Sequence, residues 1–164
     1  MDRQEAQLSF DLKTADDLFT AFSETVDEYL RKPLSARRAV VCAMLGWHIV
    51  EWLFTEAAAR GLTPDLRQLR DKVIAECPAL ARIRDVADGT KHVRLSRKTA
   101  IQKAEHHQGA FSAGFSRGFD VSALQLIVED GSLYYFDDDL KIARQYWRAL
   151  LRTYPAARTD DRAD

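Results

Sequence analysis

One short polar stretch holds most of the residues whose side chains could do chemistry. It begins at Arg84 and reads RDVADGTKHVRL, so cations, carboxylates and a histidine fall among a few apolar residues. His92 could act as a general base or acid, because an imidazole changes charge near neutral pH. Arg84 could hold a phosphate with its planar fork of donors, and Lys91 could add a point charge. Asp85 and Asp88 could orient the histidine or the cations.

These groups together could cleave RNA without a metal ion. The histidine would take the proton of the 2′-hydroxyl group while the cations stabilise the charge on the phosphoryl oxygens. A helix running straight through the stretch would place Asp85, Asp88 and His92 on one face. A solvated polar face would give the same pattern, so both interpretations stay open. Gly89 is expected to end the helix, which leaves the direction of His92 open.

A second pair of candidates, His48 and Glu51, lies in the most apolar segment of the chain. At about 100° per residue, Glu51 falls within the apolar stripe of that segment. The stripe consists of Val40, Met44, Trp47, Phe54 and Ala58. A carboxylate there is expected to be buried, where it must find a partner or take up a proton. The pair could be a structural hydrogen bond, or part of a site whose burial tunes its pKa.

The same side chains also offer nitrogen and oxygen ligands that zinc, iron or manganese accepts. The set would comprise His48, Glu51, Asp85, Asp88 and His92. Its spacing matches no strong metal motif, since the Glu-x-x-His order of di-iron bundles is reversed in His48-x-x-Glu51. We therefore predict no metal ligands and no cofactor.

The overall charge gives no general attraction to nucleic acids or acidic membranes, because the formal net charge is −1. Any contact with nucleic acid must therefore come from a local basic patch. The best candidate precedes His106 and His107 and comprises Arg94, Arg97, Lys98 and Lys103, although a solvated loop is the simpler interpretation.

Other features of the sequence favour a cytoplasmic location. The first residues lack the apolar core of a signal peptide, and no apolar run approaches the ~20 residues of a membrane span. Cys42 and Cys77 have no metal-ligand spacing and are expected to be reduced residues of the core. We expect no contact with a membrane.

The spacing of apolar residues predicts a mainly α-helical protein of about five helices, with a small antiparallel β-hairpin before the last helix. Helices are expected over 14–32, 36–60, about 66–77 and 78 to about 89, with a last helix capped by residues 137–139. Thr14 with Asp17 resembles a capping box at the start of the first helix. The hairpin spans 122–136, with Asp130 and Gly131 at its turn. Residues 96–110 could be loop or short helix, and residues 111–119 strand or ordered loop.

A single domain over residues 14–154 accounts for this pattern in a chain of 164 residues. Residues 1–13 are expected to form an arm or a short edge strand, because Leu8, Phe10 and Leu12 alternate with polar residues. Residues 155–164 are expected to be disordered.

The helical pattern and the stretch from Arg84-Asp85 to Lys91-His92 together resemble the HEPN superfamily. The resemblance covers roughly residues 15–95 and implies a helical bundle, often dimeric. It also implies a metal-independent ribonuclease or RNA-binding protein of toxin–antitoxin or antiphage systems, with Arg84 and His92 catalytic. The family signature is an arginine, a polar residue and then a histidine after four to six intervening positions, whereas seven intervene here. The stretch is also similar to an Asp-x-x-Asn-x-x-Lys-His pattern of small bacterial proteins, with Asp88 for the asparagine, which implies no activity.

Two hypotheses follow. The hypothesis that we adopt is a non-catalytic interaction module, in which the polar stretch only caps a helix and orders a loop. It would be a homodimer, because the segment 36–60 carries more apolar surface than one chain is expected to cover. Trp47, Trp52 and Trp147 would lie in the core or at the dimer seam. The alternative is the HEPN-like ribonuclease or RNA-binding protein, which a cleft shared by Arg84, His92 and Glu51 would favour.

Overall fold

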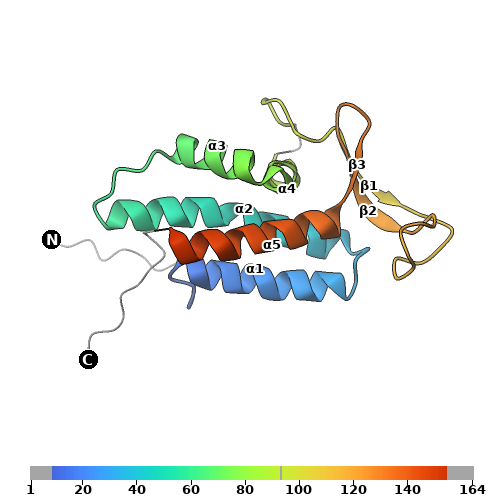
Figure 1. Cartoon of the computed structure of the whole chain (residues 1–164), viewed down its shortest axis with the longest axis horizontal. Coiled ribbons are helices and arrows are strands. Elements are labelled where there is room, and N and C mark those ends of the chain that lie inside the picture. The colour runs from blue at the N-terminus through green and yellow to red at the C-terminus, as the bar shows by residue number, and fades with distance from the viewer. Residues whose placement is uncertain (1–8, 93, 155–164) are drawn as a thin grey trace.

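The computed structural model describes residues 9–92 and 94–154, which form five helices and one three-stranded antiparallel sheet (Figure 1). The helices are α1 (Ala15–Leu30), α2 (Ala36–Ala59), α3 (Leu66–Glu76), α4 (Pro78–Lys91) and α5 (Phe136–Thr153). The strands are β1 (Lys103–His107), β2 (Ala123–Ile127) and β3 (Leu133–Tyr135), in the order β1-β2-β3. The predicted mainly α-helical class with a β element before the last helix is confirmed.

Helix α2 is the centre of the bundle and packs against all four other helices. Its N-terminus is capped by Ser35, whose hydroxyl accepts from the backbone amide of Arg38. By length and apolar composition alone this helix would also be able to cross a membrane, a test that the core helix of a water-soluble protein passes equally. Here nine of its residues are buried by the rest of the same chain.

The predicted capping box at the start of α1 is present. The Thr14 hydroxyl accepts from the Asp17 amide at 3.1 Å, and the Asp17 carboxylate accepts from the Thr14 amide at 2.9 Å. Both ends of this exchange satisfy amides that a helix start leaves free. Hydrogen bonds to the Lys13 and Thr14 amides hold the pKa of Asp17 below its ordinary value.

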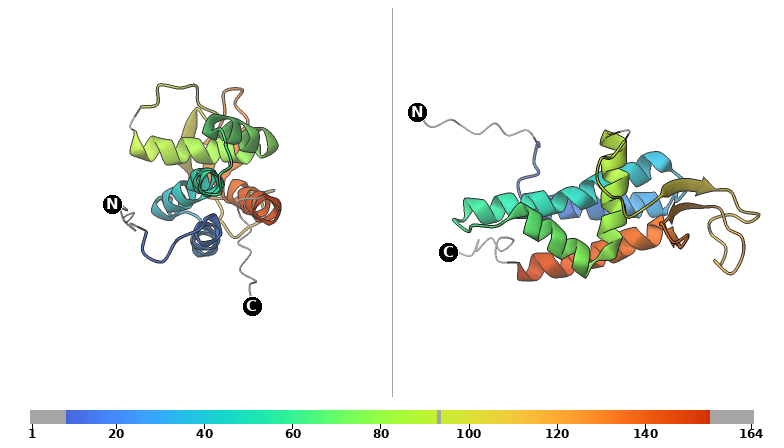
Figure 2. Two further views of the ribbon diagram at one scale, coloured as in Figure 1. Left: turned by 90° about the vertical axis from the view of Figure 1, so that its left-hand side faces the viewer. Right: turned by 90° about the horizontal axis from the view of Figure 1, so that it is seen from above.

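Helix α4 lies across the bundle rather than along it, as the two views in Figure 2 show. It begins at Pro78, a residue suited to the first turn of a helix because it has no amide to leave unpaired. The expectation that Gly89 ends this helix is wrong, because α4 continues to Lys91 and His92 is its C-cap. Arg84 and His92 therefore belong to one continuous helix and its cap.

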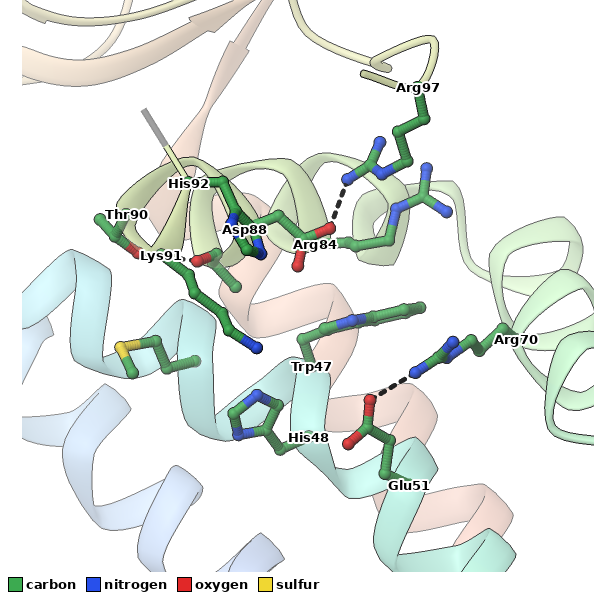
Figure 3. Close-up of a pocket in the computed structure, with 12 residues that line it drawn as sticks. Trp47, His48, Glu51, Arg70, Arg84, Asp88, Thr90, Lys91, His92 and Arg97 are labelled. Atoms are coloured by element: carbon green, nitrogen blue, oxygen red, sulfur yellow. Dashed lines mark hydrogen bonds and ion pairs between the residues drawn. The ribbon is translucent and has the colours of Figure 1, made fainter. Parts of the chain in front are cut away.

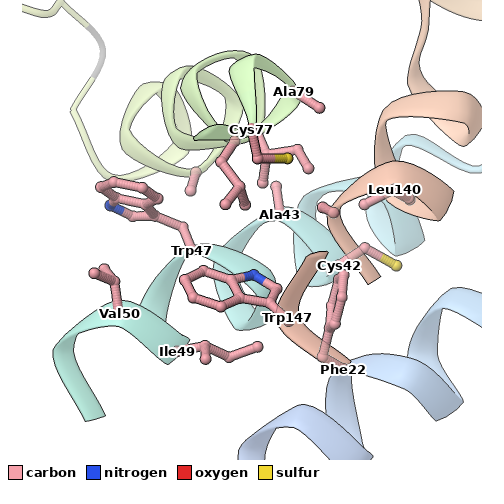
Figure 4. Close-up of a cluster of buried hydrophobic side chains, with 14 of the residues drawn as sticks. Phe22, Cys42, Ala43, Trp47, Ile49, Val50, Cys77, Ala79, Leu140 and Trp147 are labelled. Carbon is pink, nitrogen blue, oxygen red and sulfur yellow. The ribbon is translucent and has the colours of Figure 1, made fainter. Parts of the chain in front are cut away.

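The core lies where α1, α2, α4 and α5 meet (Figure 4). Trp147 is completely buried and Trp47 nearly so, whereas Trp52 is only partly buried against the core. Cys42 and Cys77 are both buried and free, as expected. Burial raises the pKa of Cys42 to about 12, so this thiol stays protonated at neutral pH.

A buried ion pair joins α4 to the start of α5. The Arg82 guanidinium donates to both carboxylate oxygens of Asp139, at 2.8 and 2.7 Å, and lies 3.7 Å from the centre of the Tyr134 ring. The predicted cap of α5 by residues 137–139 is wrong, because the helix begins at Phe136 and no side chain caps it. The three aspartates lie in its first turn, where negative charge suits the helix dipole.

The hairpin with Asp130 and Gly131 at its turn is confirmed as β2 and β3, and Gly131 has the positive φ of 82° that favours glycine. The third strand, β1, was expected to be loop or short helix. It pairs with β2 along its whole length but keeps most side chains exposed, so it lacks the apolar alternation that would reveal it. Residues 111–119 contain no strand and make one isolated bridge, between Phe111 and Val121.

The described start of the chain is a turn rather than an edge strand. The amide of Leu12 donates to the carbonyl of Ser9, and Leu12 packs against the core while Phe10 is exposed. Leu8 and the predicted tail of residues 155–164 lie outside the described residues.

Candidate functional site

A cleft of about 650 Å³ opens between the exposed side of α2 and the crossing helix α4 (Figure 3). Helix α2 supplies Met44, Trp47, His48 and Glu51; α3 supplies Arg70; α4 and its cap supply Arg84, Ala87, Asp88, Thr90, Lys91 and His92; and the following loop supplies Arg97. Its lining carries four permanent cations against two carboxylates, together with two imidazoles. The cleft therefore has a basic balance that the whole chain lacks.

The cleft brings together six of the seven candidate residues from two distant parts of the sequence. They are His48, Glu51, Arg84, Asp88, Lys91 and His92. This convergence depends on the uninterrupted course of α4, which crosses α2 and continues as far as its C-cap, His92 (Figure 2). Arg84, His92 and Glu51 share one cleft, which is the arrangement expected of a site rather than of a solvated helix face.

Arg84 is the most unusual group in the cleft, because its guanidinium is largely enclosed and has no hydrogen bond within residues 9–92 and 94–154. Its side chain is 22% exposed, and Nε is buried without a partner. The nearest carboxylate oxygen, on Asp85, lies 3.8 Å from Nε, and the Trp47 ring centre lies 5.7 Å from the guanidinium carbon. Burial lowers the pKa of Arg84, and the charge of Arg97 lowers it further.

Asp85 cannot satisfy Arg84 because other donors occupy it. One oxygen accepts from Arg97 at 2.6 Å, and the other accepts from the amides of Ala100 and Ile101, the latter at 3.0 Å. Asp85 is 3% exposed, so the expectation that it shares a solvated face with Asp88 is wrong. Asp85 therefore holds the loop of residues 94–102 against α4 and does not line the cleft.

Asp88 and Arg97 form the rim of the cleft above Arg84. The Arg97 guanidinium bridges two carboxylates, donating to Asp85 at 2.6 Å and to Asp88 at 2.7 Å. The arginine thus ties the loop to two successive turns of α4. Its fixed charge adds to the field that Arg84 experiences.

Glu51 is not the buried carboxylate that its helical stripe suggests. Its side chain is 44% exposed and pairs with Arg70 of α3 at 2.5 Å. The stripe of α2 faces a crossing helix at this point, and the crossing leaves an open cleft instead of a packed surface (Figure 3). Arg70 keeps a buried Nε without a partner among the described residues, so its capacity to donate is only partly used.

The opposite end of the cleft holds the two histidines and Lys91. His48 is exposed on α2, and the Lys91 side chain extends from α4 toward it (Figure 3). His92 stands at the C-cap of α4, where its amide donates to the Asp88 carbonyl. Two imidazoles and one ammonium thus border the space in front of Arg84.

The cationic patch expected around residues 94–107 is not assembled as one surface. Arg97 turns into the cleft, whereas Lys98 pairs with Glu129 and Lys103 with Glu105. His106 and His107 lie on β1, outside the cleft lining.

The alternative metal set is also not assembled, since no three His, Cys, Asp or Glu side chains of the described residues come close enough to hold an ion. Arg70 lines the cleft without having been predicted as a site residue, and Arg97 lines it although it was expected in a different surface. A charged residue on an amphipathic helix does not reveal in the sequence whether its side chain points into a cleft or into solvent, which is why Arg70 was not predicted.

Comparisons of the chain with protein-family models, with curated proteins and with solved structures give no match.

Proposed function

We propose that this protein binds RNA in the basic cleft and cleaves it there without a metal ion, as the resemblance to HEPN domains implies. The observation that carries the proposal is the state of Arg84. It is a largely enclosed cation with no hydrogen bond within the described residues, beside the like charge of Arg97. A phosphate would supply the hydrogen-bond acceptor atoms that this guanidinium lacks, together with a negative charge closer than the Asp85 carboxylate at 3.8 Å.

The size and mixed lining of the cleft favour a nucleotide chain over a free anion. A volume of about 650 Å³ lies within the range of small-molecule sites and greatly exceeds one phosphate. Glu51 and Asp88 add carboxylate acceptors to the lining, to which hydroxyl or amino groups of a nucleotide could donate. Because the net charge is only −1, the expected contact is local rather than spread over the surface.

The proposed roles follow from chemistry and position. Arg84 holds the non-bridging oxygens of the scissile phosphate, and Lys91 adds charge at its side. His92 takes the 2′-hydroxyl proton. Asp88 keeps Arg97 in place, and Asp85 keeps the loop behind it closed.

The test compares binding and cleavage of a single-stranded RNA by four proteins, in EDTA. They are the wild type, Arg84→Ala, Lys91→Ala and a matched control, Arg148→Ala, whose arginine is exposed on α5. Loss of a charge-assisted contact costs about 1.5–3 kcal/mol, so we expect Arg84→Ala to bind roughly 10–100-fold more weakly. Lys91→Ala, at an exposed position, repeats the test without disturbing packing. Arg148→Ala should bind like the wild type.

Binding should also weaken with salt, with a slope of log K against log salt of about −0.7 for each phosphate contacted on a single strand. His92→Asn should bind RNA but not cleave it. No RNA binding by the folded wild type would overturn the proposal. The non-catalytic association module would then be the better account of the fold.

A further inference from the structure

The chain has four histidines, and two of them, His48 and His92, line the same cleft from different helices. His48 projects from the floor formed by α2, and His92 stands at the end of the α4 wall (Figure 3). The remaining two lie on β1. The family resemblance rests on the α4 stretch and assigns His48 no role.

Metal-free cleavage of RNA moves two protons. The 2′-hydroxyl group must lose one, and the departing 5′-oxygen must gain one. A single imidazole serves only one of these sites at a time, and the arginines and Lys91 carry their protons permanently at neutral pH. A second imidazole, on the α2 side of the cleft, is suited to giving the proton to the 5′-oxygen, since the charge of an imidazole changes near neutral pH.

We infer that His48 is the general acid of this site, protonating the 5′-oxygen while His92 deprotonates the 2′-hydroxyl group, an inference that rests on the ribonuclease function proposed above. In the step, the 2′-oxygen bonds to phosphorus and the bond from phosphorus to the 5′-oxygen breaks. His92 gains the 2′-hydroxyl proton and His48 loses its own to the leaving oxygen. The products are a 2′,3′-cyclic phosphate and a 5′-hydroxyl end, with no water, oxidant or metal consumed.

Charged side chains from several elements line the cleft around His48. The charged and titratable groups that line the cleft around it are Glu51 on its own helix, Arg70 on α3, Arg84, Asp88, Lys91 and His92 of α4, and Arg97 of the loop. The Lys91 side chain extends from α4 toward His48 (Figure 3). Glu51 lies one turn along α2 from His48 and pairs with Arg70.

The experiment uses two substrates that differ in whether the leaving group needs a proton. One is a uridylyl-adenosine dinucleotide, and the other is uridine 3′-(p-nitrophenyl phosphate), whose nitrophenolate leaves without one. His48→Asn should cleave the dinucleotide about 10²–10⁴-fold more slowly than the wild type. It should cleave the aryl ester nearly as fast. His92→Asn should lose both activities, because the base is needed for either substrate.

A matched control is His106→Asn, which removes an exposed imidazole of β1 and should change neither rate. The pH profile of wild-type kcat/KM on the dinucleotide should be bell-shaped, and His48→Asn should remove its alkaline limb. Binding of a 2′-O-methyl RNA by His48→Asn should match the wild type, which shows that the cleft is intact.

The outcomes separate this inference from the proposed function. Wild-type cleavage of neither substrate would overturn the ribonuclease itself. Wild-type cleavage with equal losses on both substrates in His48→Asn, or with no loss on either, would overturn the role of His48 alone. Selective loss on the dinucleotide would support both.

Discussion

Neighbouring residues of one helix take different parts in the cleft because their surroundings differ. Asp85 is buried and accepts hydrogen bonds from Arg97 and from backbone amides. Asp88, one turn later, pairs with Arg97 and keeps a partly exposed side chain. Arg84, on the same helix, has no hydrogen bond within the part of the chain that the structure describes, and its nearest carboxylate oxygen lies 3.8 Å away. This group is the one that points to a ligand, because a largely enclosed polar group without a hydrogen bond is costly unless something binds it.

Gly89 can be tested directly, since the sequence suggests a helix end there and the structure shows a continuous helix. A Cβ at this position would meet nothing within 4 Å, and the backbone does not adopt a positive φ. We expect Gly89→Ala to raise the free energy of unfolding by about 0.5–1 kcal/mol, because alanine loses less backbone entropy in a helix. Urea denaturation followed by circular dichroism measures the change.

RNA binding by Gly89→Ala should be unchanged, since the cleft residues keep their places on the helix. A destabilised variant would mean that α4 ends before Lys91 in solution. The proposed register of Arg84 and His92 would then fail.

At the scale of residues, the sequence identified most of the site but not its electrostatics. The polar types between Arg84 and His92 indicated chemistry because they interrupt an apolar pattern. The burial of Glu51 was predicted wrongly, since a projection of one helix cannot show that its stripe faces a cleft rather than a packed neighbour. Arg70 was not identified because its contribution depends only on where α3 is placed.

At the scale of elements, the loop of residues 94–102 is held against α4 mainly through Asp85. Replacing this carboxylate with alanine would leave the Arg97 guanidinium and two backbone amides without their acceptor. We expect Asp85→Ala to destabilise the fold by about 1–3 kcal/mol, the usual cost of leaving buried donors unpaired. Amide hydrogen exchange at Ala100 and Ile101 should accelerate more than exchange in α1.

The matched control removes a carboxylate that contacts the same loop through a solvent-exposed ion pair. Glu129 pairs with Lys98, and both side chains are at least 80% exposed, so Glu129→Ala should leave stability and exchange unchanged. Equal effects of the two substitutions would show that Asp85 contributes no more than a surface ion pair.

Local signals predicted the elements that depend on local interactions. The Thr14–Asp17 box and the turn at Gly131 are such cases, because their hydrogen bonds or dihedral angles involve neighbouring residues. Strand β1 was missed because its pairing with β2 is distant in sequence and its side chains are mostly exposed. The path of α4 across the bundle, which makes the cleft, depends on packing that no single segment encodes.

At the scale of the whole molecule, the exposed apolar side chains favour a different surface for the predicted homodimer than the sequence does. Intrachain packing covers most of α2 and leaves Val41 and Met44 only about 40% exposed, at 38% and 41%. Among residues 9–92 and 94–154, three exposed phenylalanine rings instead gather on the loop between β1 and β2. There Phe111 lies 5.3 Å from the Phe115 ring centre and 5.1 Å from that of Phe119.

We expect the wild type to form a homodimer at micromolar concentration through this phenylalanine loop, because clustered exposed rings mark interaction surfaces. Phe115 and Phe119 are each 54% exposed, so Phe115→Ser combined with Phe119→Ser should yield a folded monomer in sedimentation velocity. Val41→Ser should remain dimeric. A dimer lost only in the Val41 variant would place the dimer interface on α2 instead. Met44 of that helix lines the cleft, so a second copy there would lie next to the proposed RNA site. A wild type that is monomeric throughout would leave the cleft to function within one chain.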